Sequence, residues 1–155
     1  MSTATTVAQR AQVDPRGPQF AAAVTVVILA GALLLSPSPY GIALLALQTV
    51  LFGIGALLGV SRTPHAWAFR RFIRPRLAPP AHLEDAAPPR FAQQVGLTFA
   101  LIALVFWPLG FDAVGAIAVG FALAAALLNA LFGFCLGCEV YLLFKRLTYR
   151  PAPTN

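Results

Sequence analysis

The chain has 155 residues, of which 59% are hydrophobic and only 10% are charged, and its formal net charge at pH 7 is +6. Soluble domains carry about 25% charged residues, and amphipathic helices in such domains repeat their apolar residues every three to four positions. Here the apolar residues instead form long uncharged blocks. The composition excludes an ordinary water-soluble domain and predicts an integral membrane protein.

Four apolar blocks are long enough, or nearly so, for the ~20 residues that cross a hydrocarbon layer ~30 Å thick. They predict transmembrane spans at about residues 16–35, 40–60, 91–109 and 113–144. We therefore expect an all-α integral membrane protein with one four-helix membrane domain over residues 14–146. A disordered N-terminus at 1–13 is expected before it and a tail at 147–155 after it.

The basic residues occur in only three of the five segments outside the predicted spans. They are Arg10 and Arg16, then Arg62, Arg70, Arg71, Arg74, Arg76 and Arg90, then Lys145, Arg146 and Arg150. The connections 36–39 and 108–112 carry none. Under the positive-inside rule this pattern predicts a multi-pass protein with both termini in the cytoplasm. Because topology and attraction to anionic lipid account for the positive charge, no nucleic-acid partner is expected.

The loop at 61–90 is predicted to begin with a basic amphipathic helix that lies on the membrane surface. Thr63 and Pro64 are typical of the N-cap and first helical positions. At helical pitch one face carries Ala66, Ala68, Phe69, Phe72 and Ile73, and the other carries Trp67, Arg70, Arg71 and Arg74. A segment of this kind lies in the headgroup plane. The lipid bilayer is therefore the expected partner, with a docking surface for a soluble protein as the alternative.

The fourth apolar block is too long for a single straight span. Its 32 residues would form a helix of about 48 Å, against the ~30 Å of hydrocarbon. The helix must tilt, project beyond the lipid or break. Asn129, Gly133 and Gly137 favour a break or kink in its second half.

The same half contains the two cysteines of the chain, Cys135 and Cys138, followed at once by Glu139. Counted back from Lys145 along a helix, the cysteines should lie about 10 to 15 Å inside the membrane. On a continuous helix the two thiols and the carboxylate share one side. A carboxylate in lipid costs several kcal/mol unless it is paired or protonated.

These three residue types together favour thiol chemistry. A turn opened at Gly137 would place a thiol at a helix N-terminus, which stabilises the thiolate, and Glu139 could take its proton. A cytoplasmic thiol pair would normally be reduced, so a permanent structural disulfide is not expected. The alternatives are purely structural roles. The cysteines could be two small side chains packed between helices, and the Glu139 carboxylate could snorkel toward Arg146.

Neither a metal site nor a cofactor site is expected. A structural zinc site needs four ligands, and the remaining candidates, His65 and His82, lie in the loop at 61–90. His65 falls on the apolar face of the amphipathic segment, where a packing role is expected, and His82 is expected to be solvated. Gln48 and Asn129 are expected to hold helices together. The sequence is also compatible with a homo-oligomer.

Three stretches resemble the bacterial membrane family catalogued as domain of unknown function 4395. They are Asp14-Pro-Arg-Gly-Pro18, Leu83-Glu-Asp85 with Pro88-Pro-Arg-Phe-Ala-Gln93, and Asn129 through Phe134-Cys-Leu-Gly-Cys-Glu-Val-Tyr141. The resemblance covers residues 13 to about 146. It implies a four-span protein of a prokaryotic inner membrane and an association with thioredoxin-like and sulfurtransferase-like proteins.

Three functional hypotheses follow. Cys135 and Cys138, with Glu139 as proton carrier, could relay electrons or sulfur to a soluble cytoplasmic thioredoxin-like or sulfurtransferase-like protein, the thiolate being the attacking species. Alternatively, the pair could be a binding step in a soft-metal or sulfur-compound permease, since thiolates select soft ions; in this the chain resembles mercuric-ion carriers. The third hypothesis is a non-catalytic membrane scaffold, which would tolerate serine at both positions.

Overall fold

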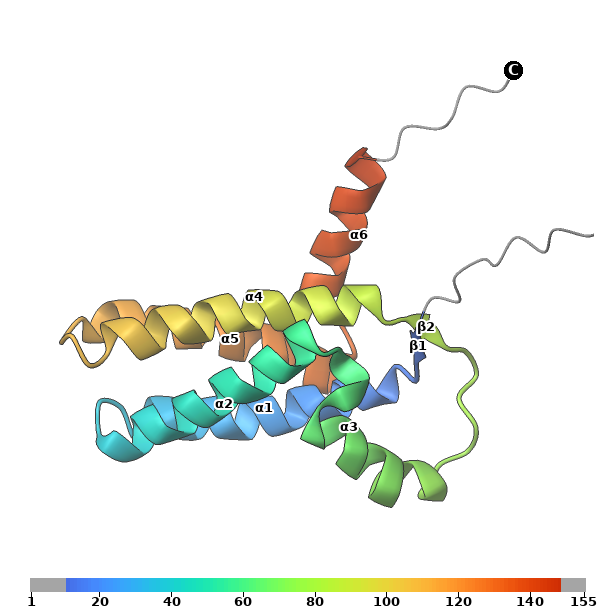
Figure 1. The fold of residues 1–155 in the computed structure, drawn as a ribbon, viewed down its shortest axis with the longest axis horizontal. Coiled ribbons are helices and arrows are strands. Elements are labelled where there is room, and N and C mark those ends of the chain that lie inside the picture. Colours follow the sequence, from blue (N-terminus) through green and yellow to red (C-terminus); the bar gives the residue numbers. More distant parts are fainter. Residues whose placement is uncertain (1–10, 149–155) are drawn as a thin grey trace, which may run out of the picture.

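The computed structural model describes residues 11–148, and within that range the protein is an antiparallel bundle of four long helices (Figure 1). They are α1 (Arg16–Leu34), α2 (Pro39–Leu57), α4 (Ala87–Phe106) and α5 (Asp112–Phe132). All four are long and apolar enough to cross a membrane. The predicted all-α class with four membrane-spanning helices is confirmed.

Small and branched side chains fill the centre of the bundle. Each long helix contacts two neighbours, in the cyclic order α1, α2, α4, α5. The core contains Leu29, Leu45, Phe52 and Val119, together with several alanines. Other large apolar side chains point outward, and Val27, for example, is 72% exposed. A surface of this kind is stable in lipid and not in water, so the bundle is built for a bilayer.

Polar and aromatic side chains contribute to the core as well. The side-chain amide nitrogen of Gln48 donates a hydrogen bond of 3.2 Å to the hydroxyl oxygen of Thr25, which joins α2 to α1 as expected for this glutamine. Trp107 is buried, and its indole nitrogen donates to the backbone oxygen of Asp112. It packs against Gly115, which leaves room for the large ring.

Two of the spans begin or end away from the predicted positions. α2 ends at Leu57, not at residue 60, because Gly59 adopts a φ of +102° that a helix cannot contain. α4 begins at Ala87, not at residue 91, so Pro88 and Pro89 lie in its first turn and not in an extended segment. Prolines fit there because the first-turn N–H groups have no helical partner.

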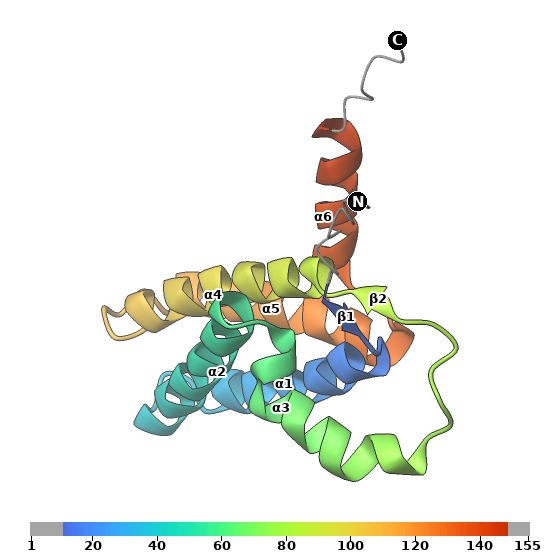
Figure 2. The same ribbon diagram turned by 45° about the vertical axis from the view of Figure 1, so that its right-hand side comes forward.

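One end of the bundle carries the basic residues of the described chain, and we call it the basic end. It comprises the first turns of α1 and α4, the last turns of α2 and α5, and the segments attached to them (Figures 1 and 2). Within the described residues, the basic side chains there are Arg16, Arg62, Arg70, Arg71, Arg74, Arg76, Arg90, Lys145 and Arg146. The turns 35–38 and 107–111 at the other end carry none. The basic residues therefore lie at one end of the long axis of the bundle.

A two-stranded ribbon ties the N-terminal segment to the long loop. β1 (Gln12–Val13) pairs antiparallel with β2 (Glu84–Asp85). Residues 12 and 13 are therefore ordered, in contrast to the prediction of disorder over 1–13; residues 1–10 and 149–155 lie outside the described range. Beside the ribbon, the guanidinium of Arg16 binds both carboxylate oxygens of Asp14 and the backbone oxygen of Ala78. These contacts fix the N-terminal segment against the loop.

The amphipathic segment is helical, as predicted, but its turns are uneven. It consists of the 3₁₀ turn η1 (Val60–Arg62), α3 (Pro64–Ala68), the π-turn η2 (Phe69–Ile73) and the 3₁₀ turn η3 (Arg74–Arg76). Thr63 caps α3 by accepting from the backbone N–H of Ala66. Phe69 is buried, but Phe72 is exposed and packs edge-on against Trp67, 5.7 Å between ring centroids. Phe72 thus lies with Trp67 and not with Phe69, because the wider π-turn changes the angular spacing.

The fourth apolar block is divided between two helices. α5 ends at Phe132, and after a three-residue link α6 (Leu136–Thr148) leaves the bundle at a steep angle (Figures 1 and 2). The predicted span 113–144 is therefore replaced by a shorter span at 112–132 and a separate helix. No residue of α6 is buried, and it carries exposed Leu143 and Leu147 beside Lys145 and Arg146. If α5 crosses the bilayer, an amphipathic helix in this orientation lies along its surface.

His65, in α3 outside the spans, is buried, and its Nε2 atom has no hydrogen-bond partner. Burial lowers the pKa of His65 below its ordinary value of 6.5. In the unfolded chain the same imidazole takes up a proton as the pH falls through about 6.5, whereas in the folded protein it does so only at lower pH. The folded state therefore loses stability as the pH falls below about 6.5.

We expect His65→Gln to reduce this loss of stability. The measurement is the thermal midpoint of the detergent-solubilised protein between about pH 7 and pH 5, where one such histidine contributes up to about 1.4 kcal/mol per pH unit. His82→Gln is the matched control, because His82 is exposed, and it should keep the wild-type dependence. Equal acid sensitivity in the wild type and His65→Gln would show that His65 is not responsible.

Candidate functional site

The link between α5 and α6 is created by Gly133. Its φ of +65° and ψ of +13° are left-handed, a conformation that costs a residue with a Cβ roughly 1–2 kcal/mol. The backbone N–H of Gly133 donates to the backbone oxygen of Asn129 at 2.9 Å, which completes the last turn of α5. The chain then changes direction before α6 begins. The predicted break thus lies at Gly133, whereas Gly137 is an ordinary residue inside α6.

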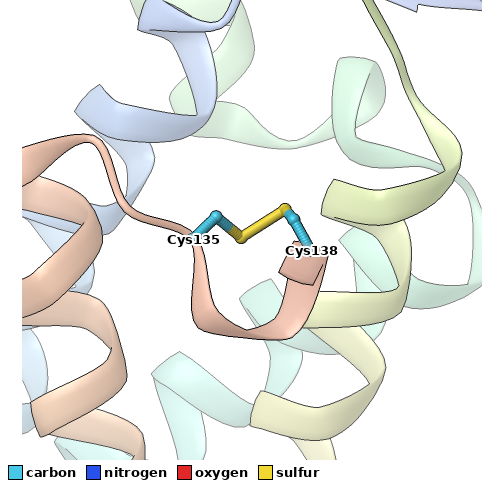
Figure 3. The surroundings of a disulfide bond; sticks show 2 residues. All are labelled: Cys135 and Cys138. Carbon is cyan, nitrogen blue, oxygen red and sulfur yellow. A yellow bond between two sulfur atoms is a disulfide. The ribbon is translucent and has the colours of Figure 1, made fainter. Parts of the chain in front are cut away.

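Cys135 and Cys138 lie on the first turn of the new helix. The backbone oxygen of Cys135 accepts from the N–H of Glu139 at 3.1 Å, which makes Cys135 the N-cap residue of α6. Cys138 lies in the first turn, and the two sulfur atoms are joined in a disulfide (Figure 3) with a Cα–Cα distance of 5.2 Å. The predicted span over 113–144 contained both cysteines, but the fourth long helix ends at Phe132, before them. The pair is at the basic end, beside the start of α4.

Glu139 is not buried in a hydrocarbon-like environment either. It is exposed on the first turn of α6. The carboxylate therefore avoids the cost that a continuous transmembrane helix would have imposed. A negative charge in the first turn is also favourable for a helix.

The start of α6 is held against the start of α4. A Cβ built on Gly137 would lie 2.7 Å from the Cβ of Ala92, so a glycine is needed for the two helices to approach this closely. About one turn further along α6, the rings of Tyr141 and Phe91 pack with their centroids 5.7 Å apart. On the other side of the link, the side-chain nitrogen of Gln19 donates to the backbone oxygen of Ala130 at 3.2 Å. The link is thus fixed to both α4 and α1.

A cavity of about 150 Å³ lies next to Cys135. Its apolar walls are Val13, Gly17, Pro18, Ala21, Val60, Ala66, Phe69, Pro89 and Ala92. Its polar lining is Gln12, Asp14, Ser61, Thr63, Arg70, Arg74, Gln93, Asn129 and Cys135. The N-terminal segment, the amphipathic segment, α4 and the end of α5 therefore all meet here. Cys138 does not line the cavity, so the two sulfur-bearing residues face different surroundings.

The charged side chains around the cavity differ in whether they are paired. The side-chain hydrogen bonds from Arg16, assisted by its positive charge, hold the pKa of Asp14 below its ordinary value of 3.8. Asp14 is thus an ionised and already paired carboxylate. Arg70 donates to the backbone oxygen of Ser61 at 2.7 Å. Neither Arg70 nor Arg74 forms an ion pair within the described residues.

The four residues predicted at the membrane surface do not all have the same surroundings. Trp67, Arg70, Arg71 and Arg74 are all exposed, but only Arg70 and Arg74 also line the cavity. Sequence reasoning missed the cavity residues Asp14, Gln93 and Asn129 as members of one site. The signal that could have found them is their presence in the three stretches that carry the family resemblance. These stretches are distant in sequence and meet at the basic end.

Comparison with known families agrees with this arrangement. A family model described as Domain of unknown function (DUF4395) matches residues 13–146. The chain belongs to this family. No curated protein and no solved structure matches the chain. The family range begins within β1 and ends within α6, and it includes every cavity-lining residue except Gln12.

Metal binding by the protein alone has little support in the part of the chain that the structure describes. No group of three or more His, Cys, Asp and Glu side chains comes together there in a way that could hold an ion. His65 is buried in α3, and His82 pairs with Glu84 at 3.4 Å in the loop. The chemistry that this arrangement offers is that of the two sulfur atoms.

Gly137→Ala should destabilise the protein by about 1–3 kcal/mol, because the new methyl group would push α6 away from Ala92. The matched control is Gly120→Ala in α5, where a Cβ meets nothing within 4 Å. Alanine favours a helix over glycine, so the control should be neutral or slightly stabilising. Thermal unfolding in detergent measures both variants, and an unchanged midpoint for Gly137→Ala would contradict the close packing of α6 on α4.

Proposed function

We propose that this protein is a membrane-bound thiol–disulfide relay in which Cys135 and Cys138 exchange electrons with a soluble thioredoxin-like or sulfurtransferase-like protein. The observation that carries the proposal is the position of Cys135 as the N-cap of α6 with Cys138 one turn later. Free N–H groups at a helix N-terminus stabilise a thiolate. A disulfide that opens here releases a stabilised leaving group.

The location of the pair supports exchange with a water-soluble partner. The basic end carries all the basic residues of the described chain, and no residue of α6 is buried. We place this end in the cytoplasm of a prokaryotic cell, because its basic residues follow the positive-inside rule. A cytoplasmic dithiol protein would then meet the pair without crossing the lipid.

The exchange proceeds in two balanced steps. A thiolate of the soluble protein attacks Sγ of Cys138, the S–S bond breaks, and Cys135 leaves as a thiolate at the N-cap. The second thiolate of the partner then attacks the partner's own sulfur in the mixed disulfide. The partner is released as a disulfide, and Cys138 leaves as a thiolate. Two electrons have passed to the relay. The Cys138 thiolate takes up a proton from water, beside the exposed side chain of Glu139.

The test is trapping with a thioredoxin whose resolving cysteine is replaced by serine. In native membranes this variant should form a mixed disulfide with the oxidised protein and free one thiol, which maleimide mass-tagging detects. Mass spectrometry should place the link on Cys138. Cys135→Ser, which cannot form the internal disulfide, is the control and should give no mixed disulfide under the same conditions.

Three outcomes would overturn the relay. One is an oxidised pair that no thiol protein or small reductant opens. Another is a double serine variant that supports every phenotype of the wild type, which would favour a scaffold. The last is protection of both thiols by soft metal ions without oxidant, coupled to uptake, which would favour a permease.

A further inference from the structure

Cys135 shares its cavity with Arg70 and Arg74, and neither arginine forms an ion pair within 4 Å among the described residues, although the positive charge of Arg74 contributes to the lowered pKa of Asp14. Arg70 and Arg74 are exposed residues that also line the cavity, so the cavity reaches the surface beside them. Cys135, in the link between α5 and α6, lines the same cavity. A small molecule that enters past the arginines therefore comes to Cys135 and not to Cys138.

The electrostatic balance of the cavity favours an anion. Its one carboxylate, Asp14, is already bound through both oxygens by Arg16. One guanidinium nitrogen of Arg70 is occupied by the Ser61 carbonyl, and Arg74 has no side-chain hydrogen bond within the described residues. Guanidinium groups recognise carboxylate, sulfonate and phosphate groups through paired N–H donors. A positively charged ligand would meet unopposed charge of its own sign.

The remaining lining fits a small molecule with a polar end and a short apolar part. The amides of Gln93 and Asn129 offer donors and acceptors, and neither makes a side-chain hydrogen bond within the described residues. Val60, Ala66 and Phe69 supply an apolar wall. An enclosed space of about 150 Å³ is known to accept a molecule as large as benzene. A soluble protein cannot enter it, so this side of the pair requires a different reactant from the one met by Cys138.

We propose that the cavity binds a small anionic sulfur compound, with its charged group at Arg74 and Arg70 and its reactive sulfur at Cys135. This inference rests on the proposed relay and names its second reactant. The Cys135 thiolate attacks a small disulfide RS–SR, forms a mixed disulfide and releases RS⁻. The Cys138 thiolate then attacks Sγ of Cys135, restores the internal disulfide and releases the second RS⁻. Two electrons pass to the compound, and the soluble dithiol protein supplies them again.

The test measures the charge preference of Cys135 with two thiosulfonate probes in the Cys138→Ser protein in native membranes. One probe is 2-sulfonatoethyl methanethiosulfonate, which is anionic, and the other is its trimethylammonioethyl counterpart, which is cationic. In both reactions the thiolate attacks the probe sulfur, a mixed disulfide forms and methanesulfinate leaves. We expect the anionic probe to react faster with Cys135 after each rate is divided by the rate of the same probe with a free thiol in solution.

Arg74→Gln should lower this anionic-to-cationic rate ratio by about three- to tenfold, as expected for one nearby charge, and Arg74→Lys should restore most of it. Arg71→Gln is the matched control, since Arg71 is exposed on the same segment but does not line the cavity. The ratio measured at Cys138 in Cys135→Ser should not respond to Arg74→Gln.

Failure of the inference is distinguishable from failure of the relay. An unchanged ratio in Arg74→Gln, or an equal drop in Arg71→Gln, would remove the anion site while leaving a reactive Cys135 and the relay intact. A Cys135 that reacts with neither probe would remove both. A Cys135 that prefers the cationic probe would also contradict the assignment of the cavity.

Discussion

The structure depends on the left-handed backbone at Gly133. A fourth apolar block of 32 residues cannot lie straight within the ~30 Å of a hydrocarbon layer, and only a residue without a Cβ turns the chain here at little cost. The turn ends the fourth span at Phe132 and starts a second helix at Leu136. In doing so it moves Cys135, Cys138 and Glu139 from the interior of a span to a helix N-terminus. The chemistry proposed for this protein follows from that relocation.

Distant segments of the chain converge on the basic end, where we propose that the function lies. The ribbon of β1 with β2 brings the N-terminal segment to the loop before α4. At the first turn of α4, the guanidinium of Arg90 donates to the backbone oxygens of Ala56 and Leu57 and so closes the last turn of α2. Gly137 brings α6 onto α4 in turn. The result is a cavity lined by Cys135, Arg70 and Arg74.

The spans could be predicted from the sequence, because the length and apolarity of a membrane helix are local properties. The same holds for the cap of α3 at Thr63 and for a break in the fourth block. The boundaries near Gly59 and Pro88 were displaced because a glycine φ and a proline in a first turn cannot be inferred from hydropathy. Phe72 was placed on the wrong face because a π-turn changes the spacing of residues on a helix.

The site itself was only partly predictable. Cys135, Cys138 and the arginines were identified by residue type, but their placement required contacts between residues far apart in sequence. Asp14 reaches the cavity through the ribbon, and Gln93 through the packing of α4 against α2, where it fills the space above Gly55. Glu139 appeared costly only on the assumption of an unbroken helix. The deciding interactions are tertiary, and no local pattern encodes them.

The position of the cysteine pair is tested most directly by labelling the reduced protein with a charged, membrane-impermeant maleimide in intact cells and in inside-out vesicles. We expect Cys135 and Cys138 to react rapidly in inside-out vesicles and not in intact cells, because we propose that the basic end faces the cytoplasm and is open to water. Ser38→Cys in a cysteine-free background should show the opposite pattern. Cysteines that react only with a membrane-permeant maleimide, at the slow rate of a Val119→Cys control in the core, would place the pair within the lipid and contradict its location at a helix N-terminus outside the span.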